Sequence, residues 1–256
     1  MISSRANPRV KLINGLQTRR KVRQKNGLFV LEGDRLIREA LACRQALNLL
    51  FVSSSASDEA MDLVQQARDL GVSVEEVSDD VMQYCSATET PPGILAVLNQ
   101  LDLPVPADLH MAVVADHFST PGNLGTLLRS AAAAGAQVVF LTEGTVDAYN
   151  PKVVRGAMGA HFRLPIHSLS AHQIGTRLAG LSIWIAEAGP GIPYSQVNWT
   201  GPSAIVIGSE AYGPQPALQK LGEHVAIPLA GGMESLNAAV AGSVILFEIQ
   251  RQRGLL

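Results

Sequence analysis

Three segments of the sequence combine glycine-containing turns with polar side chains that a packed core does not require. The first, DHFSTPGNLGTLLRSAAAAGA (116–136), places Asn123 and Arg129 beside the apolar stripe of an expected helix. Six residues of helix correspond to roughly 600° of rotation, so these two side chains point within roughly 120° of each other. Asn123 also suits the cap of a helix that we expect to begin near Leu124.

The other two segments also lead from apolar strands into polar loops. Segment 204–214, AIVIGSEAYGP, brings Glu210 directly after a strand, and 224–253 begins its long helix with Ser235 and Asn237. Loops at the C-terminal ends of parallel strands are where α/β proteins bind ligands. Ser235 suits the N-cap, whereas Asn237, one turn further on, has less structural reason to be there. Taken alone, each segment is better explained as an ordinary strand, turn and helix than as a functional site.

Several common chemistries leave no signature in this sequence. There is no GxGxxG or phosphate loop, no HExxH, and no CxxC or paired-histidine spacing, so we expect no metal. The six histidines are scattered, although His117 and His161 lie close to candidate segments. The two cysteines, Cys43 and Cys85, match no disulfide framework, which favours a reducing, cytoplasmic compartment.

The start of the chain carries an unusual concentration of charge. Residues 1–25 hold eight basic residues and no acidic one, so the remaining 231 carry −10 within a total of −2. Such a block is typical of an arm that binds a polyanion through salt-sensitive phosphate contacts. A solvated basic helix without a ligand explains the charge equally well. The sequence shows no secretory signal and no membrane-spanning apolar run, and an organellar transit peptide stays open.

Apolar strands alternate with amphipathic helices along most of the chain, which predicts an α/β fold with a mostly parallel sheet. A small α/β unit is expected over 28–99, and a proline-containing linker over 100–109. In the small unit we expect strands at 28–33, 47–54, 72–78 and 93–99, and helices at 34–45, 57–70 and 79–86. After the linker we expect strands at 111–118, 136–142, 181–188, 203–210 and 224–230, and helices at about 124–135, 150–158, 170–179, 214–221 and 235–252.

Taken in order, these segments resemble the SpoU/TrmH family of RNA 2′-O-methyltransferases. The resemblance rests on N-x-G-x-x-x-R, then G-S-E-x-x-G, then I-P followed by S-L-N and an alanine. The matching residues are Asn123, Gly125 and Arg129; Gly208, Ser209, Glu210 and Gly213; and Ile227, Pro228, Ser235, Leu236, Asn237 and Ala241. A fourth block, AYNPKVVRGAMGAHFRLPI (148–166), is also similar to the family, and LFVLEGDRLIREAL resembles the RNA-binding domain that precedes many of its catalytic domains.

The resemblance implies a domain plan and an assembly. A basic arm (1–27) and a ribosomal-protein-like RNA-binding domain (28–99) would precede a linker (100–109) and a SPOUT catalytic domain (110–256). The SPOUT domain implies a deep trefoil knot, S-adenosylmethionine as cofactor, and a homodimer with the active site between subunits. The substrate would be a ribose 2′-hydroxyl of RNA, with large-subunit ribosomal RNA favoured and a guanosine possible. Transfer RNA, an inactive RNA-binding paralogue, and a different nucleotide-binding transferase are the alternatives.

Carried onto this sequence, the resemblance assigns roles residue by residue. The expected catalytic residues are Arg129, Asn123, Glu210, Ser235 and Asn237. The expected cofactor-binding residues are Thr142, Glu143, Gly144, Gly208, Ile227, Leu229 and Leu236. With the basic block and the fourth segment, the expected RNA-binding residues are Arg5, Arg9, Lys11, Arg19, Arg20, Lys152 and Arg155.

Arg129 poses a chemical question. The resemblance implies that this arginine acts on the 2′-hydroxyl, but a guanidinium with a pKa above about 12 does not readily accept a proton. We therefore favour an electrostatic role, in which Arg129 binds the neighbouring phosphate and stabilises a developing alkoxide. Water or the phosphate would then take the proton.

Overall fold

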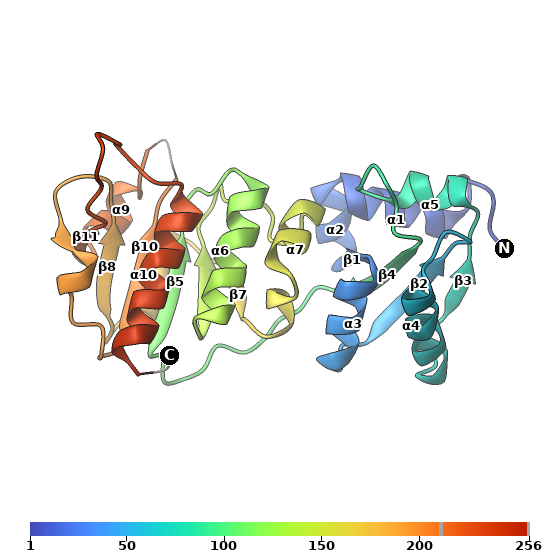
Figure 1. Cartoon of the computed structure of the whole chain (residues 1–256), viewed down its shortest axis with the longest axis horizontal. Coiled ribbons are helices and arrows are strands. Elements are labelled where there is room, and N and C mark those ends of the chain that lie inside the picture. Colours follow the sequence, from blue (N-terminus) through green and yellow to red (C-terminus); the bar gives the residue numbers. More distant parts are fainter. Residues whose placement is uncertain (210–211, 255–256) are drawn as a thin grey trace. The chain divides into compact units, whose positions relative to one another are not determined.

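The computed structural model describes residues 1–209 and 212–254, which fold into two compact units (Figure 1). The first unit combines Met1–Leu101 with Tyr149–Phe162, and the second combines Asp102–Ala148 with the chain from Arg163 onward. In the part of the chain that is described, no helix is long and apolar enough to cross a membrane.

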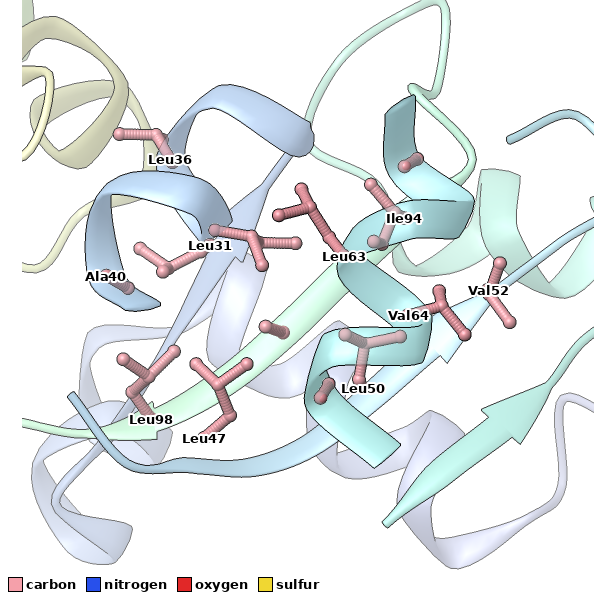
Figure 2. Packing of buried hydrophobic residues seen from close by; sticks show 14 of the residues in the cluster. Leu31, Leu36, Ala40, Leu47, Leu50, Val52, Leu63, Val64, Ile94 and Leu98 are labelled. Carbon is pink, nitrogen blue, oxygen red and sulfur yellow. The ribbon is translucent and has the colours of Figure 1, made fainter. Parts of the chain in front are cut away.

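The first unit is built on a four-stranded sheet in the order β1-β4-β2-β3. Its odd and even strand positions face two separate apolar clusters, because side chains alternate across a strand. One face is covered by α3 and α4, whose Leu36 and Leu63 pack over Leu50 and Ile94 (Figure 2). The bounds are β1 (Leu28–Glu32), α3 (Asp34–Ala42), β2 (Leu47–Val52), α4 (Asp58–Asp69), β3 (Val74–Glu76), α5 (Asp79–Cys85) and β4 (Ile94–Asn99).

The expected basic arm is instead part of the core of this unit. Residues 8–26 form helices α1 (Pro8–Thr18) and α2 (Arg20–Asn26). Val10, Ile13 and Leu16 of α1 are fully buried, and they pack against the second face of the sheet with α5. The arm prediction was therefore wrong. An apolar residue at every third position is enough to dock a helix, and the surrounding charges masked that pattern.

The second unit contains a seven-stranded sheet in the order β7-β6-β5-β10-β8-β11-β9, in which each pair of neighbouring strands is parallel. Helices α8 and α9 cover one face, where Ile174, Leu178 and Leu218 are buried. The strands are β5 (Met111–Ala115), β6 (Val138–Leu141), β7 (Ile166–Ser168), β8 (Ser182–Ala186), β9 (Ile192–Pro193), β10 (Ser203–Ile207) and β11 (Glu223–Ala226). The helices are α6 (Pro121–Ala133), α8 (Ala171–Arg177), α9 (Pro216–Gln219) and α10 (Ala238–Gln252).

Helices α6 and α10 lie side by side on the other face of this sheet (Figure 1). Gly242 of α10 makes the close packing possible, because a Cβ there would stand 2.5 Å from Ile207 Cδ1 and 2.8 Å from Leu127 Cδ1. Ser243 Oγ donates to Ser130 Oγ across the two helices at 2.7 Å. These contacts hold together helix α6, which carries Asn123 and Arg129, and helix α10, which Asn237 caps.

The α/β class and the parallel sheet are confirmed, while two details differ from expectation. The short strands β7 and β9, of three and two residues, were not predicted. The helix expected at 150–158 exists as α7 (Pro151–Ala157), but it folds with the first unit, so 110–256 is not one compact unit. Its Val154 is buried in the cluster under α3. The trefoil knot stays a prediction.

Candidate active site

A pocket opens at the C-terminal ends of β8, β10 and β11, which is the ligand-binding edge of a parallel sheet. The space between its walls and across its open mouth is about 670 Å³. Its walls are mainly apolar, and Glu187 is the one acidic side chain among the described lining residues. Glu187 Oε2 pairs with His224 Nδ1 at 2.5 Å, which orients this carboxylate at the pocket wall.

Four of the seven predicted cofactor residues line this pocket: Gly208, Ile227, Leu229 and Leu236. At Gly208 a Cβ would stand 2.1 Å from the backbone of Gly213 and Pro214, so only glycine lets the chain double back here. The other three, Thr142, Glu143 and Gly144, lie outside the lining, in the loop that follows β6.

The predicted catalytic residues Asn123 and Asn237 meet directly. Asn237 Nδ2 donates to Asn123 Oδ1 at 3.0 Å. Asn237 is also the N-cap of α10, since its Oδ1 accepts from Ala239 N and Val240 N. Asn237 was expected to lie one turn inside the helix, and Asn123 was expected to be a cap. Both expectations were wrong. The N-cap of α6 is Thr120, because Pro121 occupies the first helical position, which proline favours. Helix α10 begins at Ala238, so its N-cap is Asn237 and not Ser235.

The other three predicted catalytic residues, Ser235, Arg129 and Glu210, differ in where they lie. Ser235 lines the pocket beside Leu236. Arg129 lies on the exposed side of α6 and makes no hydrogen bond or ion pair with the residues that the structure describes. An unpaired exposed guanidinium is available to a ligand, or to a second subunit. Glu210 lies outside the described residues.

A buried carboxylate that the sequence analysis missed ties the loops of this edge together. Asp116, directly after β5, has a fully buried side chain. It accepts hydrogen bonds from Thr142 Oγ1 at 2.6 Å, Gln215 N at 2.6 Å, Gln215 Nε2 at 2.7 Å and His117 Nδ1 at 2.9 Å. An acidic residue that ends an apolar strand is the signal that could have found it. Thr142 therefore supports this network and not the pocket.

All seven predicted RNA-binding residues belong to the first unit, because α7 is part of it. Lys11, Arg19, Arg20 and Lys152 are exposed. Three of the seven have partners within the unit: Arg5 stacks over Tyr84, Arg9 pairs with Glu75, and Arg155 Nη1 lies 3.6 Å from Glu32 Oε2.

Glu32 explains the placement of Arg155. Its nearly buried carboxylate accepts bonds from the Ser86 and Thr88 hydroxyls and, at 3.0 Å, from Ala87 N. Arg155 supplies positive charge to this cluster and so has a structural contact in addition to any RNA contact.

A parallel sheet with an apolar pocket at its C-terminal edge and an asparagine pair beside that pocket is the arrangement of an α/β domain that binds a small molecule. The chain belongs to the SpoU rRNA methylase family, whose model matches residues 110–247, and residues 7–96 match an MRM3-like substrate-binding domain.

Several rRNA methyltransferases are similar to the chain over most of its length. The 23S rRNA (guanosine(2553)-2′-O)-methyltransferase RlmP of Bacillus subtilis is 31% identical, covering 97% of this chain and 98% of the relative. The 23S rRNA (uridine(2479)-2′-O)-methyltransferase of Streptomyces viridochromogenes is 32% identical, covering 98% and 92%. Human mitochondrial rRNA methyltransferase 3 is 32% identical, covering 91% of this chain and 70% of the relative.

Solved structures of rRNA methyltransferases also resemble the chain. An S-adenosylmethionine-bound rRNA methyltransferase from Sinorhizobium meliloti superposes with a TM-score of 0.87 at 27% identity, covering 100% of this chain and 98% of the other.

Proposed function

We propose that this protein transfers a methyl group from S-adenosylmethionine to a ribose 2′-hydroxyl of ribosomal RNA. The observation that carries the proposal is the apolar pocket at the ends of β8, β10 and β11, with Asn123 and Asn237 joined next to it. Relatives that align over nearly the whole chain are named as 23S rRNA 2′-O-methyltransferases, which supports the same substrate here.

The pocket suits the methyl donor by its chemistry. Ile227, Leu229 and Leu236 provide an apolar slot for an adenine, and Glu187 provides a carboxylate for a cationic or hydroxyl-bearing group. Phosphate would not suit these walls, since the described lining contains no lysine or arginine. When bound, S-adenosylmethionine supplies an electrophilic methyl group.

Arg129 and the two asparagines position the nucleophile in this proposal. A ribose hydroxyl is a weak acid, so it must be held in line and its developing charge must be stabilised. Arg129, exposed and without a described partner, would bind the adjacent phosphate and the developing alkoxide. Asn123, Asn237 and Ser235 would orient the hydroxyl, and Glu210 is proposed to assist them.

The first unit would bind the RNA. The exposed Lys11, Arg19, Arg20 and Lys152 add sequence-independent phosphate contacts, while residues 7–96 match a substrate-binding domain model. Ribosomal RNA is favoured over transfer RNA by the names of the relatives, among which guanosine and uridine targets both occur. Because a bacterial and a mitochondrial protein are both among them, the cytoplasmic location stays a prediction.

We also propose that the protein acts as a homodimer that buries α6 and α10. On α10, Val240 and Phe247 are exposed by 45% and 39%, and Val244 between them is half-buried. These three residues form one apolar stripe at positions i, i+4 and i+7. Arg129 lies on the neighbouring helix, so a partner on this face would complete a site that one subunit leaves open.

The decisive experiment maps 2′-O-methylation on ribosomal and transfer RNA from cells with and without the gene. We expect one ribosomal site to disappear in the deletion and to return with the wild-type gene. Loss of a transfer RNA site would overturn the ribosomal assignment. No lost site, together with no S-adenosylmethionine binding by calorimetry, would favour the non-catalytic paralogue.

A further inference from the structure

A second hollow opens at the same edge of the second unit, next to the pocket assigned to the methyl donor. It lies where β5 and β6 end and where the chain turns after β10. The two hollows share Ser209 and Gly213 as a common wall. A ligand in the second hollow would therefore be the immediate neighbour of one in the first.

His117 lines this hollow and is held in place by three constraints. Its Nδ1 is bonded to the fully buried Asp116 at 2.9 Å. Its ring lies against Gly144, where a Cβ would stand 2.7 Å from His117 Cδ2. Its backbone has a φ of 53°, a left-handed conformation that is uncommon for residues other than glycine. The imidazole is thus oriented before any ligand arrives.

The bond to Asp116 decides which ring nitrogen faces a ligand. A carboxylate only accepts hydrogen bonds, so the proton of the neutral imidazole lies on Nδ1. Nε2 then carries a lone pair, and it has no hydrogen-bond partner in the part of the chain that is described. Nε2 of His117 therefore presents an oriented acceptor to the hollow.

The rest of the lining points to a flat, uncharged ligand. No lysine or arginine is among the described lining residues, so phosphate is a poor match. Tyr212 is 91% exposed at the rim and offers an aromatic face, and Ser119 offers an exposed hydroxyl. Stacking on an aromatic ring combined with hydrogen bonds to the base edge is how proteins recognise unstacked RNA bases.

We propose that this hollow receives the base of the nucleotide being methylated, and that His117 Nε2 accepts a hydrogen bond from the imino N–H of guanine or uracil. The inference rests on the proposed function. Adenine and cytosine carry a lone pair at the corresponding ring nitrogen, which would face the Nε2 lone pair. The site would therefore select guanosine and uridine, the two nucleosides named for the relatives.

The test uses transcripts of the mapped ribosomal segment, with the target nucleotide set in turn to G, U, A and C. We expect wild-type kcat/KM for G and U to exceed that for A and C by at least about tenfold. His117→Asn suits the left-handed backbone but removes the ring acceptor. It should lower methylation of the native nucleotide at least about tenfold and flatten the preference among bases. The Kd for S-adenosylmethionine should stay within about twofold of wild type, as judged by calorimetry.

Two further variants sharpen the result. His172→Asn, at an exposed position of α8, is the matched control and should change neither activity nor binding. In Asp116→Asn, the new side-chain amide can donate to His117 Nδ1, which leaves the imidazole proton on Nε2. Nε2 would then be a donor, so the base preference should shift toward A and C.

The outcomes separate this inference from the proposed function. If His117→Asn retains wild-type rates and base preference, the base-pocket assignment is wrong while the methyltransferase stands. If the wild type methylates no transcript and does not bind S-adenosylmethionine, the proposed function fails and this inference fails with it.

Discussion

Asn237 caps helix α10 with its side-chain oxygen while its amide nitrogen donates to Asn123 Oδ1 in the first turn of α6, at 3.0 Å. One residue therefore has two separable tasks. The cap belongs to folding, and the cross-helix bond belongs to the candidate active site.

Substitution of Asn237 should separate these tasks. Asp can still cap the helix but cannot donate to Asn123, so Asn237→Asp should keep the melting temperature and lower kcat. Asn237→Ala loses the cap as well, which costs about 1 kcal/mol of unfolding free energy. Thermal melts and single-turnover methylation measure the two effects. Equal activity of Asn237→Asp and wild type would remove the bond from the mechanism.

Arg129 should matter for activity and hardly at all for stability. Because it is exposed and unpaired among the described residues, Arg129→Ala should change the free energy of unfolding by no more than about 0.5 kcal/mol. Loss of electrostatic stabilisation should lower kcat by roughly 10²–10³-fold. Arg129→Lys keeps the charge but not the planar fork. Near-normal activity of Arg129→Lys across a pH–rate profile would show that bidentate geometry is not required.

Gly208→Ala should abolish binding of the methyl donor. Its Cβ would lie 2.1 Å from the backbone of Gly213 and Pro214, so the main chain at the pocket wall must move. Gly201→Ala is the control, since a Cβ at Gly201 meets nothing within 4 Å and its φ needs no glycine. Calorimetry with S-adenosylmethionine should show lost binding only for the first variant. Unchanged affinity of Gly208→Ala would place the donor elsewhere.

The sequence predicted the second unit's sheet because its strands are continuous apolar runs, and it predicted α3 and α4 because their apolar positions recur at helical spacing. It did not predict α1 as core, because basic residues surround Val10, Ile13 and Leu16. It could not show that Asn237 reaches Asn123, which is 114 positions away in the sequence. Local patterns specify elements, whereas contacts between loops at a sheet edge depend on strand order.

The two cysteines should react very differently with a thiol reagent. Burial raises the pKa of the Cys85 thiol to about 12, while Cys43 is partly exposed. In the native protein at pH 8, Ellman's reagent should therefore modify Cys43 alone, and both cysteines should react after denaturation. Because the pKa of Cys85 is higher in the folded state, its protonated thiol contributes its full stabilisation below pH 9.0, the ordinary pKa of a thiol. This contribution to the free energy of unfolding is lost as the pH rises toward 12. Two fast-reacting native thiols would contradict this.

Phe247→Asp tests the proposed dimer. Phe247 is 39% exposed on α10, so an isolated subunit should tolerate the change. A buried interface would not, because an unpaired charge would lose its water. Light scattering should show dimers for wild type and monomers for the variant, with a matching loss of methylation. Met61→Asp, at a 45% exposed apolar position of α4, introduces the same charge away from this face and is the matched control.

Helix α7 also determines where this chain can be cut. A fragment that begins at residue 102 would retain Tyr149–Phe162 but lose the sheet against which Val154 and Phe162 are buried. Such a fragment would carry an uncovered apolar helix and would be prone to self-association. A chimera that exchanges RNA-binding units between relatives must therefore transplant two pieces of sequence, the N-terminal hundred residues and the α7 insert, as a single cassette.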